Sequence, residues 1–238
     1  MKKAVLFDLG GTLADYYERS EFPEILRQGI AAVEAHLSER GSPNVSSDDT
    51  ARRLEEEDYE AHDHRVRPLE ERLSTIFQLD TSAKSDAHMM TLCRLFMQPI
   101  YARSRRYDDA LPVIRELRTM GFKTGIVSNT SWGSPAALWR EEIERLGLAP
   151  HMDIVVFCRD VGWRKPARQI FEFALKQIGV EAQDCLFVGD HPDWDVAGAE
   201  AVGMEAILID RHSNVPSYRA QRIASLDELP ERLRQVTK

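Results

Sequence analysis

Side chains that suit phosphoryl transfer stand at the ends of short apolar runs in this sequence. Asp8 follows the letters VLF, Ser128 and Asn129 follow GIV, and Asp190 closes LFVGD. Lys165 lies in the loop after DIVVFC. A carboxylate can form a covalent phospho-enzyme and so divide hydrolysis into two easier steps. A hydroxyl and an ammonium group can hold the non-bridging oxygens of a phosphate.

An acidic cluster accompanies the last of these runs. Asp190, Asp193 and Asp195 fall within six positions of one another. Carboxylates crowded into one crevice repel each other, and a hard cation such as Mg²⁺, bound by one or two of them, relieves that repulsion. The residues therefore predict a magnesium site.

One predicted strand, residues 5–7, stands near the start of the chain, and from about residue 107 onward predicted helices and strands alternate. The later strands cover 123–129, 152–158, 184–190 and 205–210. The helices cover 110–121, 135–147, 166–179 and 195–203. Apolar strands separated by helices favour a parallel sheet with right-handed crossovers. Such sheets bind ligands beyond the carboxyl ends of their strands, where the residues above would meet.

A strand-poor stretch interrupts this pattern near the start of the chain. Apolar residues recur at helical spacing in 22–41, 69–79 and 86–103, and 46–64 begins with capping residues and turns polar. We expect an α/β fold: a Rossmann-like parallel-sheet core, residues 1–13 and 106–238, carrying an all-helical domain, residues 14–105.

The composition narrows the class of protein. The chain has 238 residues, 43% of them hydrophobic, and 31 basic against 39 acidic residues give a formal charge of -8. This balance argues against nucleic acid as a partner. No stretch approaches the roughly 18 apolar residues of a membrane span. Cys93, Cys158 and Cys185 are far apart and odd in number, which favours reduced residues of a cytoplasmic protein.

Four motifs in order resemble those of the haloacid dehalogenase superfamily, in the branch with a helical cap inserted after the first strand. FDLGGTL resembles the first motif, D-x-D-x-T, and Ser128 in IVSNTS matches the second. Lys165 in VGWRKPARQIF matches the third, and GDHPDWDVAGA matches the fourth. The resemblance spans essentially the whole chain and implies a Mg²⁺-dependent phosphatase acting on a small phosphorylated metabolite.

The resemblance also implies a role for each matching residue at the metal. Asp8 would be the nucleophile and a Mg²⁺ ligand, the carbonyl of Gly10 a second ligand, and Asp190 a third. Asp195 would support the metal site and belongs to the catalytic set.

A second group of matching residues would hold the substrate. Ser128 and Lys165 would bind the phosphoryl group, and Lys165 would also moderate the charge on Asp8. Asn129 is assigned to the substrate with them, against the alternative that it caps the following segment.

One departure from the family pattern affects the chemistry. Most phosphatases of this family carry a second aspartate, two residues after the nucleophile, that protonates the leaving alkoxide; this chain has Gly10 there. General acid–base help is worth on the order of 10² to 10⁴ in rate. Without that acid, either the leaving group would need little protonation, as in acyl or aryl phosphates, or a neighbouring residue such as Asp15, Glu18 or His191 would supply the proton.

Other functions stay open at this point. A catalytically weak or silent binding module of the family is one, and hydrolysis of a carbon–halogen or carbon–phosphorus bond is another. DLGGT also resembles the first phosphate loop of sugar kinases, although no second glycine-rich phosphate segment follows. The sequence leaves the substrate and the oligomeric state open.

Several residues beside the motifs are candidates for substrate selection. Trp132, Trp163 and Trp194 either rim the pocket or pack between loops. The segment that enters the insert supplies Tyr16, Tyr17 and Arg19. His62 and His64, two apart on a predicted helix, would face different sides and do not suggest a metal site.

Overall fold

A computed structural model describes residues 2–17, 19–40, 50, 53, 62–79, 85–215 and 221–236. Its centre is a six-stranded sheet in the order β5-β4-β1-β6-β7-β8, in which every neighbouring pair is parallel. The strands are β1 (Ala4–Phe7), β4 (Lys123–Ser128), β5 (Ile154–Phe157), β6 (Cys185–Gly189), β7 (Glu205–Ile209) and β8 (Gln221–Ile223). The predicted α/β fold with a parallel sheet is confirmed, and β8 is an additional edge strand.

Helices cover both faces of the sheet because successive residues of β1 point to opposite sides. Val5 and Phe7 join the core that includes residues of α5 (Ala110–Thr119) and α6 (Ala136–Arg145). Ala4 and Leu6 join the opposite core, which α8 (Arg168–Ile178) covers. β1 is therefore buried throughout, as its unbroken apolar sequence indicates.

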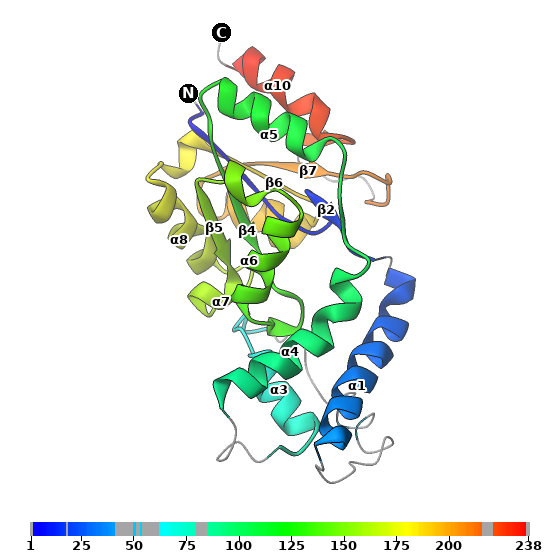
Figure 1. Ribbon diagram of the computed structural model, residues 1–238. Helices are drawn as coiled ribbons and strands as arrows, with labels where there is room; N and C mark the ends of the chain where they lie inside the picture. Colours follow the sequence, from blue (N-terminus) through cyan, green and yellow to red (C-terminus); the bar gives the residue numbers. More distant parts are fainter. Residues whose placement is uncertain are drawn as a thin grey trace.

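The remaining helices of the sheet layer are short or terminal. α7 spans Cys158–Val161, a π-helical segment spans Pro192–Ala197 and leads into α9 (Gly198–Glu200), and α10 spans Leu229–Val236. Leu229 and Leu233 of α10 extend the core on the α5 side. Figure 1 shows α5 and α10 side by side near the two chain termini.

A separate group of helices lies at the opposite end of the molecule from the termini (Figure 1). It contains α1 (Phe22–Glu39), α3 (Leu69–Ile76) and α4 (Asp86–Tyr101). The chain enters and leaves this helical part through a two-stranded antiparallel ribbon, which pairs β2 (Ala14–Asp15) with β3 (Arg105–Arg106).

The sequence predicted these three helices, and it predicted a further polar helix over 46–64. Most of that helix lies outside the described residues; residues 50 and 53 are described and are helical, as predicted. Residues 62–64 are described and do not form a helix: they lie in a turn, where His64 has a positive φ of 56°. The turn forms because His64 and its neighbours pair with a loop of the sheet layer, as described below.

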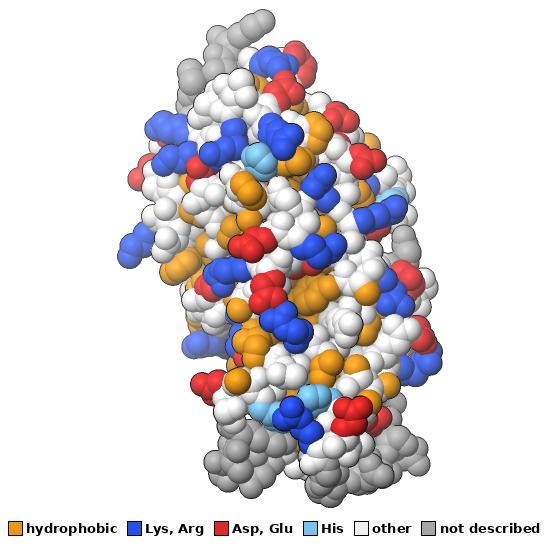
Figure 2. Space-filling model, viewed as in Figure 1, with side chains coloured by type: hydrophobic (Ala, Val, Ile, Leu, Met, Phe, Trp, Pro, Cys, Tyr) orange, Lys and Arg blue, Asp and Glu red, His pale blue; other side chains and the backbone are white. Residues whose placement is uncertain are grey.

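Two features of the molecule bear on its partners. Among the described helices, none has the length and the apolarity that crossing a bilayer would require. Figure 2 shows Lys and Arg side chains interspersed with Asp and Glu over the face in view, without an extended basic stripe on that face.

Candidate active site

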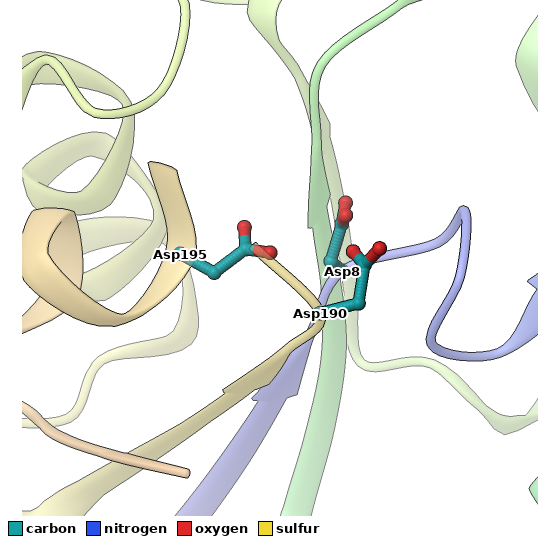
Figure 3. A group of neighbouring side chains, drawn as sticks. All are labelled: Asp8, Asp190 and Asp195. Atoms are coloured by element: carbon teal, nitrogen blue, oxygen red, sulfur yellow. The ribbon is translucent and has the colours of Figure 1, made fainter. Parts of the chain in front are cut away.

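Two carboxylates lie side by side where neighbouring strands end. Asp8 follows β1 and Asp190 follows β6, and the pairing of these two strands brings the residues together. Figure 3 shows both carboxylates just beyond the strand ends, with Asp195 directed toward them from the helical segment that follows. One oxygen of each of the three carboxylates lies within 4.8 Å of the others.

Both oxygens of the Asp195 carboxylate already have partners within the protein. It is completely buried, its Oδ1 lies 2.5 Å from Nζ of Lys165, and its Oδ2 accepts a hydrogen bond of 2.9 Å from the backbone N–H of His191. Gly189 makes this approach possible, because a Cβ at that position would lie 2.3 Å from Cγ of Asp195. Asp195 is therefore the buried member of the three carboxylates, and Asp8 and Asp190 are the more exposed ones.

Lys165 holds a buried ammonium between two carboxylates. Its Nζ lies 2.7 Å from Oδ1 of Asp8 and 2.5 Å from Oδ1 of Asp195, and only 1% of the residue is exposed. Burial by itself lowers the pKa of Lys165, but the charges of Asp195 and Asp8 outweigh it and raise that pKa above its usual value. Lys165 is thus a fixed positive charge beside the Asp8 carboxylate.

One ammonium does not balance three carboxylates. Burial, followed by the charges of Asp8 and Asp195, raises the pKa of Asp190 well above its ordinary value. Burial also raises the pKa of Asp195 to about 6, even though Lys165 acts to lower it. The cluster therefore favours an additional cation, and Asp8 and Asp190 are the two side chains placed to bind one.

The two glycines after Asp8 are glycines for different reasons. Gly11 has a φ of +69°, and a Cβ there would lie 2.3 Å from Oδ2 of Asp190. Gly10 has no such constraint: apart from its chain neighbours, a Cβ there would meet only the ring of Tyr16, at 3.6 and 3.8 Å. Gly11 therefore lets Asp190 approach the loop, whereas Gly10 leaves space next to Tyr16.

Ser128 is the last residue of β4, which pairs with β1, and Asn129 follows it. Ser128 is buried, and its Oγ donates to the carbonyl of Asn129 at 3.1 Å. The Asn129 amide binds the backbone of Lys165 in both directions: Oδ1 accepts from the Lys165 N–H at 2.8 Å, and Nδ2 donates to the Lys165 carbonyl at 3.3 Å. Asn129 thus fixes the backbone that carries the ammonium.

Two loops of the site are bound to the helical part. Trp132, in the loop after β4, stacks on Phe22 of α1 with ring centroids 5.5 Å apart and meets Phe96 of α4 edge-on at 5.3 Å. Trp132 therefore packs against two helices, whereas the sequence had left open whether it rims the pocket or packs between loops.

The second contact joins the loop before Lys165 to residues 64–67. Arg65 forms a β-bridge with Trp163, and its guanidinium carbon lies 3.8 Å from the centroid of a Trp163 ring. The N–H of Val66 donates to the carbonyl of Gly162 at 3.1 Å, and that of Arg164 to the carbonyl of His64 at 2.8 Å. Sequence reasoning missed this contact, since it pairs segments about one hundred positions apart.

Two of the proposed substitutes for the missing acid already have partners in the structure. Asp15 pairs with Arg105 at 3.0 Å. His191 uses Nδ1 to accept from the backbone N–H groups of Asp193 and Trp194, both at 3.2 Å. Glu18 lies outside the described residues, and Asp193 is exposed and does not join the three-carboxylate group.

Comparisons with known proteins identify the family of this chain. The family model for haloacid dehalogenase-like hydrolases matches residues 2–203. A glyceraldehyde 3-phosphate phosphatase of Methanopyrus kandleri is 31% identical over 231 residues, which cover 97% of this chain and 92% of that protein.

Solved structures give the same result for the fold. A HAD phosphatase from Thermococcus onnurineus superposes with a TM-score of 0.67 at 28% identity, covering 97% of each chain. A 2-haloacid dehalogenase from Pseudomonas syringae shares the fold, with a TM-score of 0.69 at 24% identity over 99% of this chain and all of that one. The family-model match covers most of the chain, and it excludes the sugar-kinase interpretation of DLGGT: the protein belongs to the haloacid dehalogenase-like hydrolase family.

Proposed function

We propose that this protein is a Mg²⁺-dependent phosphatase that hydrolyses a small phosphorylated metabolite through an aspartyl-phosphate on Asp8. The observation that carries the proposal is the arrangement of Lys165 between Asp8 and Asp195, with Asp190 on the open side. The phosphatase named above as a relative acts, by its name, on a three-carbon phosphate, which supports a small substrate.

The proposed reaction has two displacements at phosphorus. An oxygen of Asp8 attacks the phosphorus atom, and the bond from phosphorus to the leaving-group oxygen breaks. Water then attacks the phosphorus of the aspartyl-phosphate, which releases inorganic phosphate and restores the Asp8 carboxylate. Lys165 holds Asp8 in place and balances charge, while Ser128 and Asn129 line the phosphoryl side.

Asp8, Asp190 and the carbonyl of Gly10 would hold the magnesium ion. A bound Mg²⁺ supplies electrostatic stabilisation of the charge on the transferring phosphoryl oxygens. The donor set is all oxygen, as this hard cation prefers, and the raised pKa values of Asp190 and Asp195, caused first by burial and then by neighbouring carboxylates, support a cation at the cluster.

We further propose that residues 14–105 act as the cap that selects the substrate, on a core formed by 1–13 and 106–238. The β2–β3 ribbon at both crossings and the contacts of Trp132 and Arg65 with the site loops support this division. The three buried, unpaired cysteines support a reducing compartment such as the cytoplasm.

The test measures release of inorganic phosphate from a panel of phosphates and phosphonates, and release of halide from haloacids, each with and without Mg²⁺. We expect Mg²⁺-dependent cleavage of p-nitrophenyl and acetyl phosphate, and a loss of at least about 10³-fold in Asp8→Asn, because the nucleophile is gone. Asp193→Asn is the matched control, since that carboxylate is exposed and outside the group.

Each alternative predicts a different outcome. A silent binding module would bind Mg²⁺ and a phosphate analogue such as beryllofluoride without any turnover by the wild-type protein. Release of halide from a haloacid would indicate hydrolysis of a carbon–halogen bond. Release of phosphate from a phosphonate would indicate hydrolysis of a carbon–phosphorus bond. Equal rates from wild type and Asp8→Asn would remove Asp8 from the mechanism.

A further inference from the structure

Arg211 lies in the loop after β7 and contacts the turn that follows β1. β7 ends at Ile209, and Arg211 stands two positions later. Its Nη2 donates a hydrogen bond of 2.7 Å to the carbonyl oxygen of Thr12, which lies 199 positions earlier in the chain. Arg211 therefore joins two loops that leave the carboxyl ends of different strands of the sheet.

The guanidinium group of Arg211 is fixed by two further contacts. Nη1 and Nη2 donate to Oδ2 and Oδ1 of Asp109, at 2.8 and 2.9 Å, and form a bidentate ion pair whose side chains are only 11% and 10% exposed. The guanidinium carbon also lies 3.8 Å from the centroid of the Tyr107 ring. Because these contacts fix a planar group, its bond to Thr12 has a defined direction.

Asp109 is itself fixed by the segment that follows β8. Its Oδ2 accepts hydrogen bonds of 2.9 Å from Oγ of Ser225 and from the backbone N–H of Leu226. Burial acts to raise the pKa of Asp109, but the hydrogen bonds from Arg211, Leu226 and Ser225 outweigh it and keep that pKa below its ordinary value. The ion pair is therefore charged at neutral pH and is attached to the sheet layer.

The turn that Arg211 contacts carries both glycines of the site. Two hydrogen bonds of 2.9 Å to the carbonyl of Leu9 close the turn, and a third joins the N–H of Gly11 to the carbonyl of Ala14 at 2.9 Å. Thr12 is completely buried within this turn. The turn is thus a compact unit, and a bond to one of its carbonyls constrains its neighbours.

Gly11, the residue directly before Thr12, brings this turn against the metal site. The backbone of Gly11 approaches the Asp190 carboxylate so closely that a Cβ would have no room between them. Gly10, the next residue back, is the one whose carbonyl the proposed function assigns to the cation. The bond from Arg211 therefore acts one residue away from the contact between the turn and Asp190.

We propose that Arg211 is a positioning residue for the magnesium site: its bond to Thr12 holds the turn of Gly10 and Gly11 against Asp190 and so sets the affinity for Mg²⁺. The inference rests on the metal site of the proposed function. Arg211 acts only through the turn, and it is assigned no contact with the substrate.

The experiment measures Mg²⁺ affinity by calorimetric titration, and the Tm in EDTA, for full-length wild type, Arg211→Met and Arg211→Lys. Arg211→Met should weaken Mg²⁺ binding at least about tenfold, because the turn loses a hydrogen bond from a charged donor. Arg211→Lys should recover most of the Tm that Arg211→Met loses, since its charge still faces Asp109. Its affinity should stay at least about fivefold below that of wild type, because one ammonium cannot replace the planar fork that binds Asp109 and Thr12 together.

Arg118→Met is the matched control. Nη1 of Arg118 also joins an aspartate, Asp153 at 2.7 Å, to a backbone carbonyl, that of His151 at 3.1 Å. Both partners precede β5, so this ion pair lies at the amino ends of the strands, away from the site. We expect Arg118→Met to lower the Tm and to leave the affinity for Mg²⁺ unchanged.

The outcomes separate the inference from the proposed function. Wild-type protein that binds no Mg²⁺ overturns both, and wild-type protein that binds Mg²⁺ but releases no phosphate overturns the proposed function alone. The inference alone is overturned if Arg211→Met or Arg211→Lys binds Mg²⁺ as tightly as wild type, or if Arg118→Met weakens binding as much as Arg211→Met does. Arg211→Lys, which keeps the ion pair, supplies the comparison if Arg211→Met does not fold.

Discussion

At the scale of single residues, the adjacent glycines Gly10 and Gly11 differ in whether the structure has room for a side chain. Gly11 combines a left-handed backbone with an approach to Asp190 that leaves no room for a side chain, whereas Gly10 has an ordinary backbone and free space beside it. The sequence pattern identified Gly10 as unusual because the family has an acid there. It gave no signal that Gly11 is the more constrained of the two.

Alanine at the two positions should separate these roles. Gly11→Ala should weaken Mg²⁺ binding at least about tenfold and destabilise the fold by about 1–3 kcal/mol, because the new methyl group displaces the Asp190 carboxylate and the residue is strained at positive φ. Gly10→Ala should bind Mg²⁺ as wild type does. Calorimetric titration with Mg²⁺ measures the difference, and equal affinities of the two variants would contradict the geometry.

The residues that sequence reasoning placed together are those whose position follows from a strand end. Asp8 and Asp190 follow apolar runs that could only be buried parallel strands, and the structure brings both to one edge with Lys165 and Asp195. The side-chain bonds of Asn129 to the Lys165 backbone depend on the course of a loop, which no periodicity in the sequence encodes.

At the scale of elements, the helical part is bound to the loops that adjoin Ser128 and Lys165. Trp132 inserts from the loop after β4, and residues 64–67 pair with the loop that leads to Lys165. Arg159 of α7 and Glu70 of α3 add a half-buried ion pair of 2.8 Å between the same two parts. A shift of the helical part would therefore reach Lys165 and Ser128 through their own loops.

Two further glycines test this coupling. A Cβ on Gly133 would lie 2.0 Å from the carbonyl oxygen of Arg67, whereas a Cβ on Gly162 would meet nothing within 4 Å, although both residues have positive φ. Gly133→Ala should therefore speed hydrogen exchange of the Val66 amide at least about tenfold relative to Gly162→Ala, because only the first change pushes the paired segment away. Exchange measured on both variants gives the comparison, and similar protection of Val66 in the two would contradict the coupling.

The sequence did not predict several short and edge elements, nor the eight-residue helix α10. β2 and β3 have two residues each, and β8 has three, which is too few for an alternating pattern to stand out. Their pairing is decided by neighbours far along the chain. Longer helices such as α1 and α8 were predicted because each repeats its apolar face over several turns.

At the scale of the whole molecule, the acidic site makes stability depend on pH and on metal. The folded-state pKa of Asp195, about 6, is above its ordinary 3.8, so the folded protein retains a proton that the unfolded chain has lost between those values. The free energy of unfolding of the metal-free protein should therefore fall as pH rises from about 4 through about 6, by on the order of 3 kcal/mol from this group.

Magnesium should reverse that loss. We expect Mg²⁺ to raise the Tm more at pH 8, where the carboxylates are ionised, than at pH 5, where protons compete for them. Scanning calorimetry in EDTA and in Mg²⁺ at both pH values measures this, with Asp190→Asn as the control that should lose most of the shift. A Tm increase that is equal at both pH values would contradict the assignment of the cluster.

The strand order has one more consequence, for the way this chain is made. β1 is synthesised long before its two partners in the sheet, β4, which starts at Lys123, and β6, which starts at Cys185. Both edges of this apolar strand therefore stay uncovered until β6 has been synthesised, and an exposed strand edge favours aggregation. Asp8 stands at the end of this strand, which we expect nascent-chain chaperones to shield during synthesis.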